Sequence, residues 1–363
     1  MVIDIIVGAR PNFMKVAPII RALEVHSKSG GLLTYRLIHT GQHYHPNLSE
    51  AFFKQLSMPK PLINFNVGSG SQAEQTGKIM VKYEEILTKK PSKACLVVGD
   101  VNSTMACAIV AQKSKIPVAH VEGGLRSGDW SMPEEINRII TDAISNWFFT
   151  TSETANQNLL KLGVAEDRIF FVGNTMIDTL LKNRDYFVKP LFYEEYNLQL
   201  RKYFVCTLHR PSNVDDLLIL KELIFKICLA VRNFPVILPV HPRTSQALKK
   251  LDSIPPNLYL VDAQPYLEFN YIVQNSMAVI TDSGGVTEET TVLGIPCLTL
   301  RSTTERLETV SIGTNELIGT NPSAIKPAID RLFLGEWKKG SIPKKWDGKA
   351  GERIVKALVK LLC

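Results

Sequence analysis

Short runs of β-branched and other apolar residues alternate with longer segments of helical period along most of the chain. This alternation is typical of α/β domains, because parallel strands need long crossover connections that are usually helical. The predicted strands fall into two series, 2–7, 35–40, 94–98, 118–121, 147–150 and 169–172, then 203–208, 236–240, 258–261, 278–281 and 297–300. With 363 residues, the chain exceeds what one hydrophobic core usually supports, so two domains are expected.

The two series of strands are separated by residues 183–202, which are rich in aromatic and charged side chains and show no clear period. We expect an N-terminal domain over residues 1–173 and a C-terminal domain over residues 174–350. The last predicted helix, about residues 351–363, is expected to pack back onto the first domain.

Composition excludes several classes of protein. The 42 lysines and arginines exceed the 35 aspartates and glutamates, but the excess is scattered, and no basic run with interleaved aromatics indicates a nucleic-acid-binding module. No segment has the roughly 18 apolar residues of a membrane span, and no signal peptide is indicated. The six cysteines lack CxxC spacing, which is typical of reduced thiols. We expect a cytoplasmic protein that binds neither nucleic acid nor membrane.

Ionisable residues follow many of the predicted strands directly. In open parallel sheets the carboxyl ends of the strands carry the ligand site, so residues from both halves are expected to face one shared cleft. These residues are Arg10, Asp100 and Glu122 in the first half and His209, His241 and Asp282 in the second. None of them has the spacing of a metal site, so we expect no metal.

Residues 281–289, with the sequence TDSGGVTEE, carry the sharpest local signal. A strand runs into Ser283, Gly284 and Gly285 where a helix should begin. Small residues let a ligand approach the backbone N–H groups, and the helix dipole favours an anion there. A simple N-cap does not need two glycines, so a diphosphate-binding turn is favoured. No GxGxxG follows the first strand, which disfavours a dinucleotide cofactor.

Eight motifs, taken together and in order, closely resemble the non-hydrolysing UDP-N-acetylglucosamine 2-epimerases. They are GARP at 8–11 with Lys15, GD at 99–100, HVEGGLR at 120–126, PEEINR at 133–138, GNT at 173–175, HR at 209–210, DSGG at 282–285 with EE at 288–289, and TTER at 303–306. The resemblance implies two Rossmann-like domains arranged as in the GT-B glycosyltransferases, with UDP held mainly by the second. It also implies a homodimer that interconverts UDP-GlcNAc and UDP-ManNAc without NAD or metal.

The same resemblance implies roles for the matching residues. The catalytic set is Asp100, Glu122 and Glu134 at the sugar, with His209 near the phosphates. The residues that bind substrate are Arg10, Lys15 and Arg306, then Ser283, Gly284 and Gly285 at the diphosphate, Glu289 at the ribose, and Gln264 and Phe269 at the uracil. In bacterial relatives Gln42 and His43 belong to a site at which UDP-GlcNAc also activates the enzyme. The chain departs from its relatives at Gly123, a common Ala, at Tyr44-His45 in that activator segment, and at Pro211-Ser212, where acidic residues are frequent.

The chemistry explains why carboxylates and cations are both needed. The proton on C2 of GlcNAc is not acidic, and it becomes removable only as UDP leaves C1. The enzyme must therefore stabilise a departing diphosphate and place bases at C2. A hydrolysing 2-epimerase and a 2-epimerase of a modified UDP-GlcNAc remain alternatives. A GT-B glycosyltransferase is more distant, since Pro296 and Cys297 stand where a Glu-x7-Glu motif would place its second glutamate.

Overall fold

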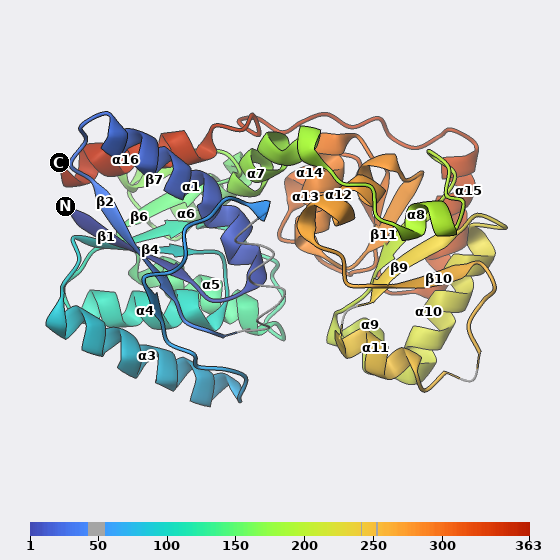
Figure 1. Cartoon of the computed structure of the whole chain (residues 1–363), viewed down its shortest axis with the longest axis horizontal. Helices are drawn as coiled ribbons and strands as arrows, with labels where there is room; N and C mark the ends of the chain where they lie inside the picture. Colours follow the sequence, from blue (N-terminus) through green and yellow to red (C-terminus); the bar gives the residue numbers. More distant parts are fainter. Residues whose placement is uncertain (43–54, 241, 252) are drawn as a thin grey trace. The chain divides into compact units, whose positions relative to one another are not determined.

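The computed structural model describes residues 1–42, 55–240, 242–251 and 253–363 (Figure 1). They form two compact units. The first comprises Met1–Lys182 and Lys344–Cys363, and the second comprises Asn183–Pro343. Each unit is built on its own parallel sheet, which confirms the predicted fold class of two Rossmann-like α/β domains.

The first unit holds a seven-stranded sheet in the order β3-β2-β1-β4-β5-β6-β7, with every neighbouring pair parallel. The strands are β1 (Val2–Val7), β2 (Thr34–His39), β3 (Ile63–Asn64), β4 (Ala94–Val98), β5 (Val118–Val121), β6 (Trp147–Thr150) and β7 (Ile169–Phe171). All six strands predicted in this half are present. The edge strand β3 is not among them, because two residues are too few to show a pattern.

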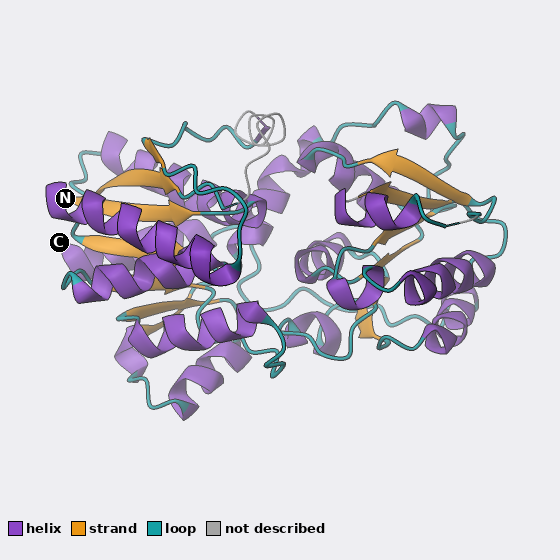
Figure 2. Ribbon diagram, turned by 90° about the horizontal axis from the view of Figure 1, so that it is seen from below, coloured by secondary structure: helices purple, strands orange, loops and turns teal. Residues whose placement is uncertain are grey.

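Helices cover both faces of this sheet (Figure 2). One face carries α3 (Gln72–Lys89), α4 (Asn102–Lys113) and α5 (Pro133–Ile144), which pack side by side. On the other face α1 (Arg10–Lys28) packs against α16 (Ala350–Leu362). The unit also contains α6 (Glu153–Lys161) and α7 (Thr175–Asn183). The buried residues of α3 are Gln75, Ile79, Tyr83 and Leu87, whose spacing of four places them on one stripe.

The boundary between the units lies after α7, whereas we expect the second domain to begin before it. Helix α7 is held in the first unit because Thr179 donates a hydrogen bond to the Met14 carbonyl (2.6 Å). Asp178 of α7 also accepts hydrogen bonds from the first backbone N–H groups of α16. The returning segment is anchored just before α16 by Trp346, which is 2% exposed and donates to the Thr151 carbonyl.

The second unit holds a six-stranded parallel sheet in the order β10-β9-β8-β11-β12-β13. Its strands are β8 (Phe204–Thr207), β9 (Val236–Val240), β10 (Leu258–Asp262), β11 (Ala278–Thr281), β12 (Cys297–Thr299) and β13 (Asn315–Leu317). Its helices are α8 (Phe192–Glu195), α9 (Pro211–Val214), α10 (Leu217–Ala230), α11 (Pro242–Leu248), α12 (Tyr266–Asn275), α13 (Gly284–Leu293), α14 (Leu307–Ser311) and α15 (Ile325–Phe333). Within the described ranges, no helix is both long and apolar enough to cross a membrane.

The order of the strands reverses once in each sheet. In the first sheet the chain moves outward from β1 to β3 and then returns to β4 on the other side of β1. In the second sheet the same reversal separates β8 from β11. Such switch points open a crevice at the carboxyl ends of the strands, where α/β proteins bind ligands.

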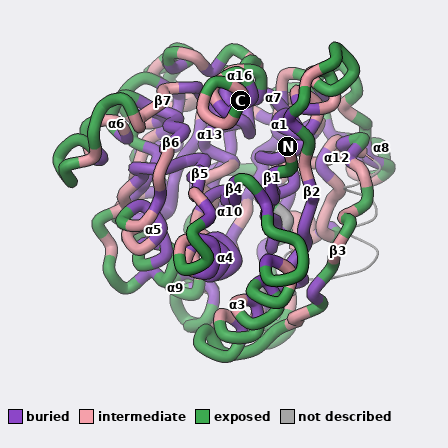
Figure 3. Tube along the Cα trace, turned by 90° about the vertical axis from the view of Figure 1, so that its left-hand side faces the viewer, coloured by how far each residue is buried: buried purple, intermediate pink, exposed green. Residues whose placement is uncertain are grey.

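Burial follows this architecture. In Figure 3 the central strands β4 and β5 are buried along their length, whereas α3 shows exposed residues on its outer side. The predicted free thiols are also present: all six cysteines are unpaired, and only Cys363 is exposed. Buried polar residues at the ends of these apolar strands are therefore exceptions that need an explanation.

Candidate active site

A buried ion pair lies at the switch point of the first unit. Lys15 reaches from α1 to Glu122, directly after β5, with 2.8 Å between Nζ and Oε2. The two residues are only 6% and 2% exposed. Glu122 has φ of 71°, a left-handed conformation that is strained for a residue with a side chain. Its backbone N–H is held by the Phe149 carbonyl at 2.9 Å, so neighbouring strands stabilise this conformation.

Asp100 follows β4 and lies next to the same pair. Its carboxylate pairs with Arg138 of α5, and its carbonyl accepts a hydrogen bond from Asn137 (2.8 Å). The preceding Gly99 has φ of 70°, and a Cβ there would lie 3.0 Å from Lys15 Nζ and 3.8 Å from Glu122 Oε2. The left-handed backbone and the close approach to Lys15 both favour a glycine in this turn. The structure thus pairs Lys15 with Glu122, and Asp100 follows the glycine that borders this pair.

The two adjacent glutamates at the start of α5 have different environments. Glu134 is exposed, and it makes no hydrogen bond or ion pair within the described part of the chain. Glu135 is buried and accepts hydrogen bonds from the backbone N–H groups of Ser127 and Gly128 and from Arg138. Burial alone raises the pKa of Glu135, but these hydrogen bonds outweigh it and the pKa is lowered. Glu135 therefore braces a loop, and Glu134 is the glutamate available to a ligand.

The remaining predicted residues of the first unit are described only in part. The side chain of Arg10 and the whole of His43 lie outside the described residues. Gln42 is buried, and its Oε1 accepts hydrogen bonds from the N–H and O–H groups of Ser103 at the start of α4. Within the described residues, Gln42 therefore stabilises the start of α4.

An aspartate–histidine pair lies at the switch point of the second unit. Asp282 follows β11, is fully buried, and has its Oδ1 2.8 Å from Nδ1 of His209, which follows β8. The Asp282 carboxylate also accepts from the backbone N–H groups of His209 and Arg210 and from Asn213. Burial raises the pKa of Asp282, but the hydrogen bonds and charge of His209 outweigh it and the pKa is lowered. An ionised partner at Nδ1 fixes the hydrogen there and makes Nε2 the basic nitrogen of the neutral ring.

The start of α13 has the features of an anion site. Ser283 is its N-cap but forms no side-chain capping hydrogen bond, so the first N–H groups of the helix are not capped in this way. A Cβ on Gly284 would lie 2.6 Å from Glu305 Oε1 and 3.8 Å from an Arg301 nitrogen. Arg301 in turn pairs with Glu305 at 2.7 Å. A guanidinium therefore lies beside the helix start, where it can share an anionic ligand.

Two buried acids follow on α13. Glu288 pairs with Arg306, with 3.0 Å between Oε1 and Nε. Glu289 is 4% exposed, and burial raises its pKa to about 7 although Tyr266 and Asn270 hydrogen-bond to it. Such a carboxyl changes its charge near neutral pH and can accept hydrogen bonds from hydroxyl groups.

Gln264 and Phe269 are half-buried around the start of α12. Gln264 donates a hydrogen bond to the Asp262 carbonyl (2.7 Å), and the Phe269 N–H donates to the Pro265 carbonyl. Both residues are therefore held in place at the end of β10, in the unit that contains the α13 helix start.

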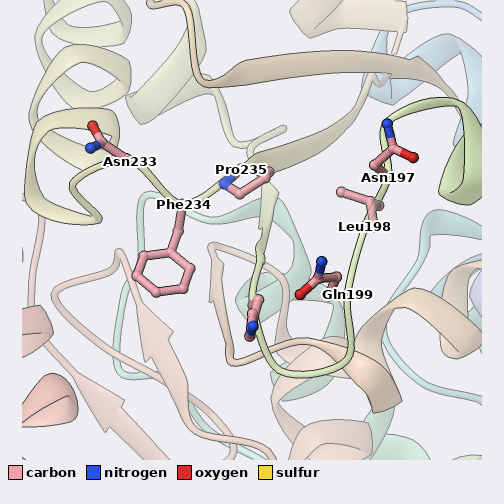
Figure 4. Close-up of a pocket in the computed structure, with 7 residues that line it drawn as sticks. Asn197, Leu198, Gln199, Asn233, Phe234 and Pro235 are labelled. Carbon is pink, nitrogen blue, oxygen red and sulfur yellow. The ribbon is translucent and has the colours of Figure 1, made fainter.

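Two hollows of the surface lie away from these switch points. One, of about 290 Å³, is lined by residues that precede β8 and β9, among them Gln199 and Phe234 (Figure 4). The other, of about 410 Å³, includes Thr34 and Tyr35 at the beginning of β2. Both lie at the amino ends of strands, the edge opposite to the polar residues described above.

Sequence reasoning missed several participants. Arg138 and Glu305 lie within the PEEINR and TTER motifs, and Arg301 directly follows the last predicted strand, but the sequence gives no sign that Arg138 pairs with Asp100 or Arg301 with Glu305. His120 and Asp142 form a buried pair, for which the only signal in the sequence is a histidine within a predicted strand. Among the described residues, no cluster of three His, Cys, Asp or Glu side chains could hold a metal ion.

Comparison with known proteins shows the family of the chain. The family model for UDP-N-acetylglucosamine 2-epimerase matches residues 26–359. The UDP-N-acetylglucosamine 2-epimerase of Methanocaldococcus jannaschii is 42% identical, with 99% of both chains covered. The UDP-2,3-diacetamido-2,3-dideoxy-D-glucuronate 2-epimerase of Pseudomonas aeruginosa is 35% identical, with 98% of this chain and 99% of its own covered.

Solved structures agree with these relatives. The crystal structure of Methanocaldococcus jannaschii UDP-GlcNAc 2-epimerase in complex with UDP-GlcNAc and UDP matches with a TM-score of 0.89 at 41% identity, covering 99% of this chain and 100% of that one. The enzyme from Neisseria meningitidis bound to UDP-GlcNAc matches with a TM-score of 0.88 at 29% identity, covering the same shares. These similarities confirm the GT-B-like fold class.

Proposed function

The chain belongs to the UDP-N-acetylglucosamine 2-epimerase family, and from this premise we propose that it interconverts UDP-GlcNAc and UDP-ManNAc by eliminating and re-adding UDP. The observation that carries the proposal is that each unit holds one of the two groups of residues that the reaction needs. The first unit presents carboxylates at its switch point, Asp100 and Glu122 with Lys15. The second presents a glycine helix start flanked by a guanidinium.

In the proposed reaction one carboxylate takes the C2 proton. The electron pair of that C–H bond forms a C1=C2 double bond, and the C1–O bond breaks with its pair going to UDP. The products are 2-acetamidoglucal and enclosed UDP. Protonation of C2 on the opposite face and re-formation of the C1–O bond give the epimer. Two faces need two proton-carrying groups, and Asp100, Glu122 and Glu134 are the proposed set.

The second unit is proposed to hold the nucleotide. The Ser283 hydroxyl and the backbone N–H groups of Gly284 and Gly285, with Arg306 and His209, stabilise the negative charge that develops on the leaving diphosphate. Glu289 accepts hydrogen bonds from the ribose hydroxyls, and Gln264 and Phe269 contact the uracil. Arg10, whose side chain lies outside the described residues, is also proposed to contact the nucleotide-sugar.

A second candidate is a 2-epimerase of a modified UDP-GlcNAc. It is favoured by the 35% identity to the Pseudomonas aeruginosa enzyme, whose name gives a diacetamido glucuronate as its substrate. The chemistry at C1 and C2 is the same in both candidates, so the roles of the carboxylates do not change. A homodimer, which rests on the family resemblance, and a cytoplasmic location, which rests on the composition of the sequence, are further parts of the proposal.

The test is incubation with UDP-GlcNAc, and separately with UDP-ManNAc, followed by NMR of the products. The proposal expects the same equilibrium mixture of both nucleotide-sugars from either side. Release of free ManNAc and UDP would instead identify a hydrolysing enzyme. No turnover of either compound, with turnover of a 3-acetamido derivative, would support the second candidate.

A further inference from the structure

His120 is a histidine inside the central strand β5 and is completely buried. Its Nδ1 lies 2.7 Å from Oδ1 of Asp142 on α5, and its Nε2 lies 2.8 Å from the carbonyl oxygen of Gly99. A carbonyl oxygen only accepts hydrogen bonds, so Nε2 carries a hydrogen. The other nitrogen faces a carboxylate. An imidazolium that donates from both nitrogens satisfies both contacts.

Asp142 is 3% exposed and uses both carboxylate oxygens. Besides His120, it accepts hydrogen bonds from the Gly124 N–H (3.0 Å) and from the Arg126 guanidinium (2.6 Å). Burial raises the pKa of Asp142, but the charges and hydrogen bonds of His120 and Arg126 outweigh it and the pKa is lowered. Asp142 is therefore an ionised group that is fully hydrogen-bonded in the interior.

The pair joins the two turns that present the proposed catalytic carboxylates. Through His120 it holds the Gly99 carbonyl, one residue before Asp100. Through the Gly124 N–H it holds the loop two residues after Glu122. That loop needs such support, because Glu122 has a strained φ of 71° and strained residues persist only where their surroundings over-determine them.

Gly123 makes room for this arrangement. A Cβ at that position would lie 3.0 Å from the Phe148 ring and 3.3 Å from Asp142 Oδ1, closer than most real contacts. A buried ion pair seldom adds net stability over apolar packing, which favours a role in holding a defined geometry.

We propose that His120 and Asp142 are positioning residues that hold Asp100 and Glu122 in register with each other for proton transfer at C2. This inference rests on the proposed 2-epimerase function, since the two carboxylates matter only if they exchange protons with the sugar. Neither member of the pair is proposed to touch the substrate. Small displacements of reacting groups are enough for such an effect, because a shift of about 1 Å can lower a rate by about 10²-fold.

The test compares variants of the full-length protein. Asp142→Ala and His120→Phe break the link, and each should lower kcat by roughly 10²-fold. UDP affinity, measured by calorimetry, should stay within about 2-fold, because the proposed nucleotide site lies in the other unit. The double variant should be little worse than either single variant, since both act through the same link. Asp142→Asn keeps hydrogen-bonding atoms on both sides and should restore most of kcat.

A matched control distinguishes positioning from stability. Arg36 and Asp4 form another buried ion pair in the same sheet, with 2.6 Å between Nε and Oδ1, on β2 and β1. Arg36→Met should lower the melting temperature but leave kcat of the folded protein unchanged. NMR of ¹⁵N-histidine protein gives a readout besides activity: both ring nitrogens of His120 should be protonated in the wild type, and only one in Asp142→Asn.

The outcomes separate the two claims. A wild-type protein that turns over no nucleotide-sugar would contradict the proposed function, whatever the His120 signals show. An active wild type whose Asp142→Ala and His120→Phe variants keep near-normal kcat would overturn the positioning role. The role would also be overturned if Arg36→Met lost kcat to the same degree, because loss of stability would then explain the whole effect.

Discussion

The carboxylate of Asp282 holds Nδ1 of His209 at 2.8 Å while remaining fully buried itself. It also accepts three hydrogen bonds from the chain segment that carries the histidine, so the ring is fixed in position as well as in tautomer. The proposed function places His209 near the phosphates of UDP, where a fixed Nε2 can assist the departing diphosphate.

Asp282→Asn tests this relationship. An amide at this position turns an N–H group toward Nδ1 and reverses the tautomer, so we expect kcat to fall roughly 10²-fold or more. Steady-state kinetics with UDP-GlcNAc measure the effect. Asp216→Asn is the matched control, because Asp216 is an aspartate in the same unit that caps α10 and should tolerate the amide. Equal kcat in wild type and Asp282→Asn would contradict a catalytic role for the Asp282–His209 pair.

Gly284→Ala tests the diphosphate site. Its Cβ would lie 2.6 Å from Glu305 Oε1, so the helix start must shift or the Arg301–Glu305 pair must move. We expect UDP affinity to fall roughly 10-fold or more, because backbone N–H groups that face phosphate tolerate little displacement. Calorimetry with UDP measures it. Gly77→Ala on α3, where a Cβ meets nothing within 4 Å, should leave affinity unchanged. Unaltered affinity in Gly284→Ala would make this turn an ordinary helix start.

Glu134→Gln and Glu135→Gln should affect different properties. Glu134 is exposed and without a partner in the described residues, so its amide should leave stability unchanged but lower kcat roughly 10²-fold or more if it exchanges a proton with the sugar. Glu135 is buried and hydrogen-bonded, so its amide should lower the free energy of unfolding by about 1–3 kcal/mol. Kinetics and thermal unfolding measured on both variants make the comparison. A Glu134→Gln enzyme with wild-type kcat would exclude Glu134 from the catalytic set.

Many residues of this site could be predicted from the sequence. Residues that directly follow strands, such as Asp100, Glu122 and Asp282, were predictable because the carboxyl ends of parallel strands meet at one edge of a sheet. The paired glycines at 284 and 285 were equally clear, because little besides close backbone approach calls for them. Most strands followed from short β-branched runs, but the edge strands β3 and β13, of two and three residues, did not.

The residues that support the proposed catalytic carboxylates could not be predicted from the sequence. His120 and Asp142 lie 22 residues apart and meet only because α5 packs beside β5. The contrast between Glu134 and Glu135 depends on which side of α5 faces the sheet, and a first helical turn carries too little pattern to show it. The boundary after α7 depends on single contacts, such as Thr179 to Met14, that no local pattern encodes.

Glu289 gives a prediction for pH. Its pKa is raised from 4.5 to about 7 by burial, so the folded protein binds this proton more tightly than the unfolded chain does. Its contribution to stability is therefore complete below about pH 4.5 and is lost as the pH rises through about 7. Relative to Glu289→Gln, which binds no proton, the wild type should lose up to about 3 kcal/mol of unfolding free energy between pH 5 and 8. Denaturant titrations measure this free energy. The transition to follow is the unfolding transition that shifts when UDP is added. Parallel pH profiles of the two proteins would show that Glu289 keeps an ordinary pKa.

The central claim is that the C2 proton leaves the sugar and is replaced by one from a carboxyl group that exchanges with water. The most direct measurement is turnover of UDP-GlcNAc in D2O, with ¹H NMR and mass spectrometry of both nucleotide-sugars. We predict one deuterium at C2 of the UDP-ManNAc formed, and at C2 of the recovered UDP-GlcNAc as the reaction reaches equilibrium. Epimerisation that leaves protium at C2 of both compounds would contradict the elimination mechanism.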